Sequence, residues 1–87
     1  MSTFELTIST PDGNKFEGKV TRLFVRGCEG DLAVLAGHIP FATAVVSCTV
    51  KIDLPDGTTK TADTESGILT VGEDKVILLS SGIGELV

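Results

Sequence analysis

Few residues in this sequence are able to carry out chemistry. His38 is the single histidine, and the chain has neither tyrosine nor tryptophan. A nucleophilic triad would require His38 to meet a serine and a carboxylate from distant segments. None of the serines lies in a Gly-x-Ser-x-Gly turn; they are Ser2, Ser9, Ser47, Ser66, Ser80 and Ser81. The sequence therefore predicts no catalytic residues, and a small hydrolase built around His38 is kept as an alternative.

The two cysteines, Cys28 and Cys48, lie symmetrically on either side of His38, a spacing that raises the question of zinc. A structural zinc site normally has four ligands, with close pairs such as Cys-x-x-Cys. No fourth ligand stands out in the sequence. We therefore expect reduced thiols that are buried or half-buried, and no metal site or cofactor.

Two further motifs have plain structural interpretations. The segment Gly82-Ile83-Gly84 resembles the start of a phosphate-binding glycine loop, but it lacks the third glycine and a following helix. We interpret it as a flexible terminus. The adjacent carboxylates Glu73 and Asp74 follow Gly72, and we expect them in an exposed hairpin turn.

Length and charge exclude several classes of protein. With 87 residues, of which 41% are hydrophobic, the chain is expected to form a single domain, residues 1–87, with one small core. This size excludes a two-domain enzyme and a multi-span membrane protein. The net charge is −5, whereas nucleic-acid binders are usually basic. Lys15 and Lys19 are the closest approach to a basic cluster, and Glu17 interrupts them, so we expect no nucleic-acid partner.

The ends and apolar runs of the chain bear on its location. The start of the sequence has neither the basic nor the apolar segment of a secretory signal, and the longest apolar run is 76–79. A spanning helix needs about 20 apolar residues. We therefore expect a cytoplasmic protein that contacts a membrane only through a partner.

The elements that must position these residues are predicted to be strands. Apolar residues alternate with polar ones at 4–9 and 48–54, and further strands are expected at 16–25, 32–35, 41–46, 58–63, 68–71 and 75–80. The segment 16–25 is expected to be either one strand or two strands broken near Gly18. Because 32–35 and 76–79 are apolar without alternation, we expect both of their faces to be covered. Val, Ile and Thr supply 26 residues, and no window supports a helix, so the fold class is all-β, with about eight to ten short strands in a sandwich or small barrel.

A corner at the end of 32–35 is the most distinctive local feature. It reads Gly37-His38-Ile39-Pro40-Phe41. Gly37 can adopt a positive φ, and Pro40 restricts Ile39 to extended geometry, so the corner should be rigid. Such a corner is either ordinary turn chemistry or a shaped loop for a partner, and the residues alone leave both open.

The sequence resembles a known family. Residues 29–40, read as E-G-D-L-A-V-L-A-G-H-I-P, are similar to the pattern E-G-E-L-G-I-L-P-G-H-A-P of the epsilon subunit of F-type ATP synthase, called delta in mitochondria. Residues 4–13 resemble that family's opening strand and T-P-x-G turn, and 16–20 its F-x-G-x-V. Residues 66–71 resemble G-G-F-L-E-V, and 75–79 the final strand. The resemblance covers nearly the whole chain in order.

This resemblance implies a sandwich of two mostly antiparallel five-stranded sheets. It also implies a non-catalytic rotor protein at the foot of the central stalk, with the gamma subunit and the c-ring as partners, on the cytoplasmic side of the membrane. Its role would be to couple ion translocation to ATP synthesis. The alternative is a free-standing β-sandwich binding module that serves another assembly.

The resemblance also suggests which residues contact partners. The turn containing Glu29, Gly30 and Asp31 matches a loop that faces the c-ring, with a solvated acidic turn as the other interpretation. The corner containing Gly37, His38, Ile39, Pro40 and Phe41 matches a segment near gamma.

The chain departs from the family pattern at several positions. Ala33 stands where glycine is common, Ala36 where proline is common, and Cys48 where a Pro-Gly turn is common. The family commonly continues into a C-terminal helical hairpin that can inhibit hydrolysis. The chain stops at Val87, so we expect no C-terminal helical domain and no inhibition of that type.

Overall fold

The computed structural model describes residues 2–37 and 39–87, and it contains strands and no helix among them. In chain order the nine strands of this described part are β1 (Phe4–Thr10), β2 (Gly13–Val20), β3 (Arg22–Gly27), β4 (Gly30–Leu35), β5 (Phe41–Val45), β6 (Cys48–Asp53), β7 (Thr59–Thr64), β8 (Gly67–Val71) and β9 (Lys75–Ser80). The all-β prediction is confirmed. The described residues therefore contain no helix that is long and apolar enough to span a membrane.

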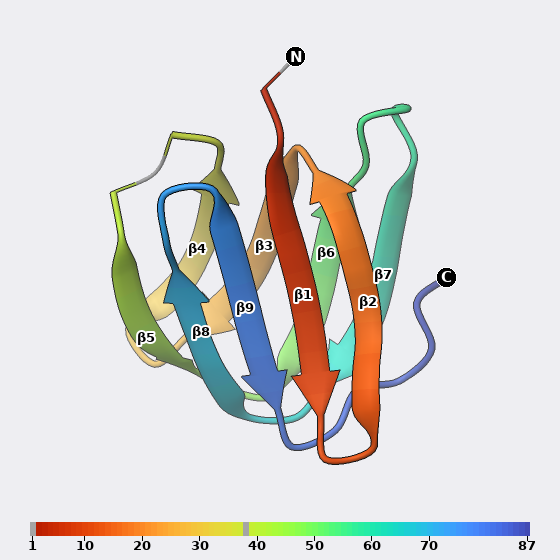
Figure 1. Cartoon of the computed structure of the whole chain (residues 1–87). Helices are drawn as coiled ribbons and strands as arrows, with labels where there is room; N and C mark the ends of the chain where they lie inside the picture. The colour runs from red at the N-terminus through yellow and green to blue at the C-terminus, as the bar shows by residue number, and fades with distance from the viewer. Residues whose placement is uncertain (1, 38) are drawn as a thin grey trace.

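The strands curl into two packed layers (Figure 1). One layer holds β2-β1-β9-β8-β5 in that order, and the other is built from β4, β3, β6 and β7. All strand pairs are antiparallel except β1 with β9. The predicted sandwich is therefore confirmed. Hydrogen bonds connect all nine strands into one network, an arrangement that is compatible with two five-stranded sheets.

The core fills the space between the layers. Its fully buried members alternate along the strands with exposed ones, as a strand with one covered face requires. The largest of them are Leu6, Ile8, Leu23, Ile52, Leu69 and Leu78. Burial of each such side chain contributes about 1.5–3 kcal/mol, so this layer contact accounts for most of the driving force for folding.

The segment 16–25 is divided between two strands, as the sequence suggested, but the break does not lie near Gly18. Gly18 lies inside β2, paired with Leu6, and the chain turns instead at Thr21. There both the backbone N–H and the side-chain hydroxyl of Thr21 donate to the carbonyl oxygen of Asp53, at 2.8 and 3.1 Å. These bonds anchor the chain to β6 as it passes from one layer to the other.

The expectation that both faces of 32–35 and 76–79 are covered is also wrong. Leu35 is 46% exposed and Leu79 is 52% exposed. Their sequence neighbours Val34 and Leu78 are fully buried, because only the inner face of each strand meets the opposite layer.

The C-terminal segment does not form the flexible end that its glycines suggested. It lies along the free edge of β7 and continues that layer. The Gly84 N–H donates to the carbonyl of Asp63 at 2.9 Å, and Thr61 and Val87 exchange two backbone bonds of 3.0 and 3.1 Å. The segment begins at a buried hydroxyl pair, in which the Thr64 and Ser80 oxygens lie 2.7 Å apart and Ser80 donates to the carbonyl of Gly82. Backbone pairing and these hydroxyls fix the segment despite Gly82 and Gly84.

Candidate partner-binding surfaces

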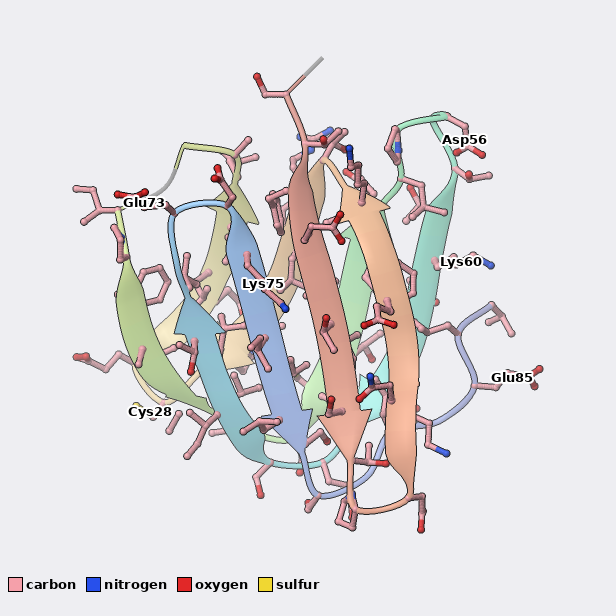
Figure 2. All side chains as sticks on the ribbon, in the orientation of Figure 1. Cys28, Asp56, Lys60, Glu73, Lys75 and Glu85 are labelled. Atoms are coloured by element: carbon pink, nitrogen blue, oxygen red, sulfur yellow. The ribbon has the colours of Figure 1, made fainter. Side chains whose placement is uncertain are left out.

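The β3–β4 turn is a tight structure with an exposed acidic tip. Gly30 has a φ of +126°, a conformation that suits glycine, and it pairs with Gly27 at the end of β3. The Cys28 N–H donates to the carbonyl of Ala44 at 3.2 Å, which attaches the turn to β5. Cys28 itself is exposed, contrary to the prediction of a covered thiol, and Figure 2 shows it at the lower end of the molecule in that view.

The two acidic residues of this turn differ in their surroundings. The Asp31 carboxylate accepts a hydrogen bond from Arg26 Nε at 2.8 Å across the β3–β4 pair. This hydrogen bond, with the charge of Asp31, raises the pKa of the Arg26 guanidinium. Glu29 is exposed and has no ion-pair partner within 4.0 Å among the described residues. Glu29 is therefore the carboxylate of the turn that is available to an incoming cation.

The β4–β5 corner has the backbone geometry that the sequence suggested. Gly37 has a φ of +82°, as predicted, and Pro40 is exposed. Ile39 is 82% exposed, the highest value among the large hydrophobic residues of the described part. Phe41 is half-buried and begins β5, opposite Val71. His38, which the sequence analysis placed in this corner, lies outside the described residues.

The predicted site residues form two separate groups. Glu29, Gly30 and Asp31 lie at the start of β4, whereas the corner follows its end. Six residues of strand at about 3.3 Å each separate them by roughly 20 Å. Figure 1 shows the two connections at opposite ends of β4. A single ligand therefore does not join them, and they suit two different neighbours in an assembly.

A third surface was not anticipated from the sequence. On the outer face of the first layer, cross-strand pairing places Ala44 beside Ile68 and Ile68 beside Leu79. The next row joins Ala42, Thr70 and Ile77 in the same way. Neither row contains a charged residue, although 22% of the chain is charged.

This neutral face is unusual for the outside of a small acidic domain. Ile68 is 54% exposed and Leu79 is 52% exposed, and they are direct neighbours across β8 and β9. Adjacent exposed aliphatic side chains without intervening charge are typical of a protein-binding surface. The signal in the sequence was the unbroken apolar run 76–79, which we interpreted as a strand with both faces covered.

No metal-binding cluster of three or more His, Cys, Asp or Glu side chains occurs in the described part of the chain. The Cys48 sulfur instead accepts a hydrogen bond from the backbone N–H of Arg26, at 3.4 Å. The zinc alternative used His38 and falls partly outside the described residues.

Glu73 and Asp74 are exposed in the β8–β9 turn, as predicted, and Figure 2 shows Glu73 there.

Comparison with known proteins adds independent evidence. Residues 3–84 match the family model described as ATP synthase, Delta/Epsilon chain, beta-sandwich domain. The sodium ion specific ATP synthase epsilon chain of Acetobacterium woodii is 37% identical over 78 residues, which cover 90% of this chain and 59% of the relative. The chain therefore spans about three fifths of the length of that relative.

Solved structures with the same fold come from mitochondrial ATP synthases. A chain of the Euglena gracilis enzyme, in a structure that includes the c-ring, superposes with a TM-score of 0.90 at 19% identity, covering 97% of this chain and 54% of the other. A chain from the central stalk and c-ring of the Tetrahymena thermophila enzyme gives 0.81 at 12% identity, with coverage of 97% and 67%. At these identities the likeness supports the fold alone. With the family match over nearly its whole length, the chain belongs to the ATP synthase delta/epsilon family and represents its beta-sandwich domain.

Proposed function

We propose that this domain is a non-catalytic part of the central stalk of an F-type ATP synthase. In this role it contacts the gamma subunit and the c-ring and helps to couple ion translocation to ATP synthesis in other subunits. It associates with the membrane only through the complex, on the cytoplasmic side. Family membership supports the setting, and the neutral outer face of β5, β8 and β9 is the observation that carries the binding role.

We assign the gamma contact to that neutral face together with the β4–β5 corner. The corner leads directly into β5, which carries Ala42 and Ala44 of the two rows, so corner and face form one continuous surface. Ile39 extends the surface with another exposed aliphatic side chain. Burial of Ile68 and Leu79 against a partner would each contribute about 1 kcal/mol or more, since roughly half of each side chain is still open to water.

We assign the c-ring contact to the β3–β4 turn. Its tip is acidic, and Glu29 is free to pair with a basic or amide group of a polar loop. Each such exposed pair is worth about 0–1 kcal/mol, so the turn adjusts the fit rather than supplying most of the affinity.

The test of the gamma contact compares two charge insertions. Leu79→Asp places a carboxylate in the neutral face, and Leu35→Asp is the matched control, because Leu35 has similar exposure on the outside of the other layer. Binding to the gamma subunit from the same source is measured by size-exclusion chromatography and isothermal titration calorimetry at micromolar concentration. We expect Leu79→Asp to weaken binding at least tenfold and Leu35→Asp to change it less than threefold. Equal loss in both variants, or no binding by the unmodified chain, would contradict the proposal.

The alternative of a free-standing binding module makes a different prediction. Such a module would use the neutral face to bind a partner outside the synthase. It would not bind the gamma subunit, and Leu79→Asp would weaken its binding to that other partner. The position of its gene relative to the gene of the catalytic beta subunit provides an inexpensive second observation.

A further inference from the structure

The outer face of the second layer holds an aromatic ring among cationic side chains. Along β3 the inward residues Leu23 and Val25 are buried, so Arg22, Phe24 and Arg26 point outward. Lys51 of β6 lies directly opposite Phe24 in the strand pairing, and its Nζ is 5.2 Å from the ring centroid. The Arg22 guanidinium carbon is 5.9 Å from the same ring. Both distances are within the range of a cation–π interaction.

Phe24, Arg26 and Lys51 line an open groove of about 800 Å³, and Arg22 lies beside it over the Phe24 ring. Its apolar lining includes the cross-strand neighbours Phe24 and Ala33, together with Val25, Leu32 and Cys48. Arg26 and Asp31 lie on one side, and Lys51 and Thr61 on the other. The groove crosses β4, β3, β6 and β7, which at about 4.8 Å between strands is a span of roughly 15 Å.

The charged groups that line the groove are Arg26, Lys51 and Asp31, with one more positive than negative charge. The carboxylates on this face are already bonded: Asp31 to Arg26, Asp53 to Arg22 and Thr59, and Asp63 to Thr49. Lys51 has no carboxylate within 4.0 Å among the residues that the structure describes. The arginines are bonded through Nε, and no hydrogen bond from their terminal nitrogens to a described residue is present. Two of the seven basic residues of an acidic chain, Arg26 and Lys51, therefore line the groove, and a third, Arg22, lies beside it, each with N–H donors that bond no described residue.

We propose that this groove binds an extended acidic segment of a partner protein. Carboxylates of the segment would accept hydrogen bonds from Lys51 and from the arginine terminal nitrogens, and an apolar or aromatic residue between them would cover Phe24 and Ala33. The span of the groove accommodates four or five extended residues, and alternate side chains of such a segment project to the same side.

Charge and shape favour this occupant over others. A polynucleotide carries a charge at every phosphate, and the acidic remainder of the domain would repel it. An acidic segment carries only a few charges, and Lys51 and the terminal nitrogens of Arg26 in the groove, with those of Arg22 beside it, supply donors for them. The groove is on the opposite side of the sandwich from the neutral face, so both surfaces are free to bind at once and the proposal does not depend on the gamma contact.

The test uses a defined probe. A nine-residue peptide alternates glutamate with threonine and has a central phenylalanine, and its counterpart replaces every glutamate by glutamine. Each is titrated into the isotopically labelled full chain, and backbone amide shifts are followed by NMR. We expect the acidic peptide to shift amides in 22–26, 31–33 and 49–51 while 68–71 and 75–79 stay unchanged, and to bind at least tenfold tighter than the glutamine peptide.

Three variants locate the interaction. Lys51→Glu should lower the affinity for the acidic peptide at least tenfold, and Phe24→Ala at least threefold. Lys75→Glu is the matched charge control, because Lys75 lies in the other layer, where Figure 2 labels it, and it should lower the affinity less than threefold. Amide spectra of each variant verify folding independently of binding.

Several results would overturn the proposal. Equal affinity for the two peptides, or an equal loss of affinity for the acidic peptide in Lys51→Glu and Lys75→Glu, would show that the groove does not recognise carboxylates. Binding to vesicles containing phosphatidylserine that is stronger than peptide binding and lost in Lys51→Glu would assign the groove to a membrane surface instead.

Discussion

Replacing Gly67 tests whether close contact of β8 with β9 holds the outer surface of the first layer in place. Gly67 pairs with Ser80 on one side and with Val45 on the other. A Cβ atom added to Gly67 would overlap the Leu79 carbonyl oxygen and lie 2.9 Å from Ser80 Cα. Both obstacles are backbone atoms, so no side-chain rotation relieves the contact, and Gly67→Ala must push the two strands apart.

The magnitude follows from the kind of contact. Inserting atoms into packed structure typically costs about 1–3 kcal/mol, and a backbone obstacle places Gly67→Ala in the upper part of this range, at about 2–3 kcal/mol. For a domain of this size 1 kcal/mol corresponds to about 4–8 °C in Tm, so we expect a fall of roughly 8–24 °C.

Gly18→Ala is the matched control. The nearest atoms to its added Cβ belong to the Phe16 ring, at 3.8 Å, which is an ordinary contact. Because alanine loses less backbone entropy on folding than glycine, this variant should be neutral or stabilising by up to about 1 kcal/mol.

The assay is urea unfolding followed by far-ultraviolet circular dichroism, since the chain lacks tryptophan for fluorescence. A shift of the midpoint without a change of slope gives the stability difference directly. The free energies of unfolding of Gly67→Ala and Gly18→Ala are then compared. A difference below about 0.5 kcal/mol, which is on the order of the extrapolation error, would show that the close approach of β8 and β9 does not constrain this position.

Two further predictions concern the β6–β7 turn and the C-terminal segment. The Asp56 carboxylate accepts hydrogen bonds from the hydroxyl and the N–H of Thr58, the first being the larger cause of its lowered pKa. A lowered folded-state pKa contributes stability that is present above the unfolded value of about 3.9 and lost as the pH falls through the folded value, so Asp56→Asn should cost stability at pH 6 and less near pH 2. Urea midpoints at both pH values measure this, and an equal cost at both would refute it. Thr64→Val removes a buried hydroxyl from Ser80 and should cost about 1–2 kcal/mol and speed hydrogen exchange at the Gly84 and Val87 amides, which an unchanged exchange rate would contradict.

Local sequence patterns predicted the strands well for a physical reason. A strand with one covered face requires apolar and polar residues to alternate, and residues 48–54 do so. The alternation therefore predicted β6, and the turn after it predicted the hairpin with β7. The positive φ of Gly37 was predictable in the same way, because it depends on the residue itself.

What failed depends on contacts that are distant in sequence. The break at Thr21 is set by Asp53, 32 residues away, and the C-terminal segment is held by β7. The exposure of Leu35 and Leu79 depends on which face meets the other layer. Lys15 and Lys19 were the apparent basic cluster, whereas the register of β3 and β6 brings Arg22 and Lys51 to one aromatic ring.

The most direct test of the central-stalk role is site-specific photocrosslinking in the assembled complex. A photoreactive phenylalanine analogue is placed at Ile68, at Glu29 or, as a control in the exposed β6–β7 turn, at Asp56, and the products are identified by mass spectrometry. We predict that Ile68 crosslinks to the gamma subunit, that Glu29 crosslinks to the c subunit, and that Asp56 gives neither product. Failure of Ile68 to crosslink to gamma in a complex that contains the chain would contradict the account.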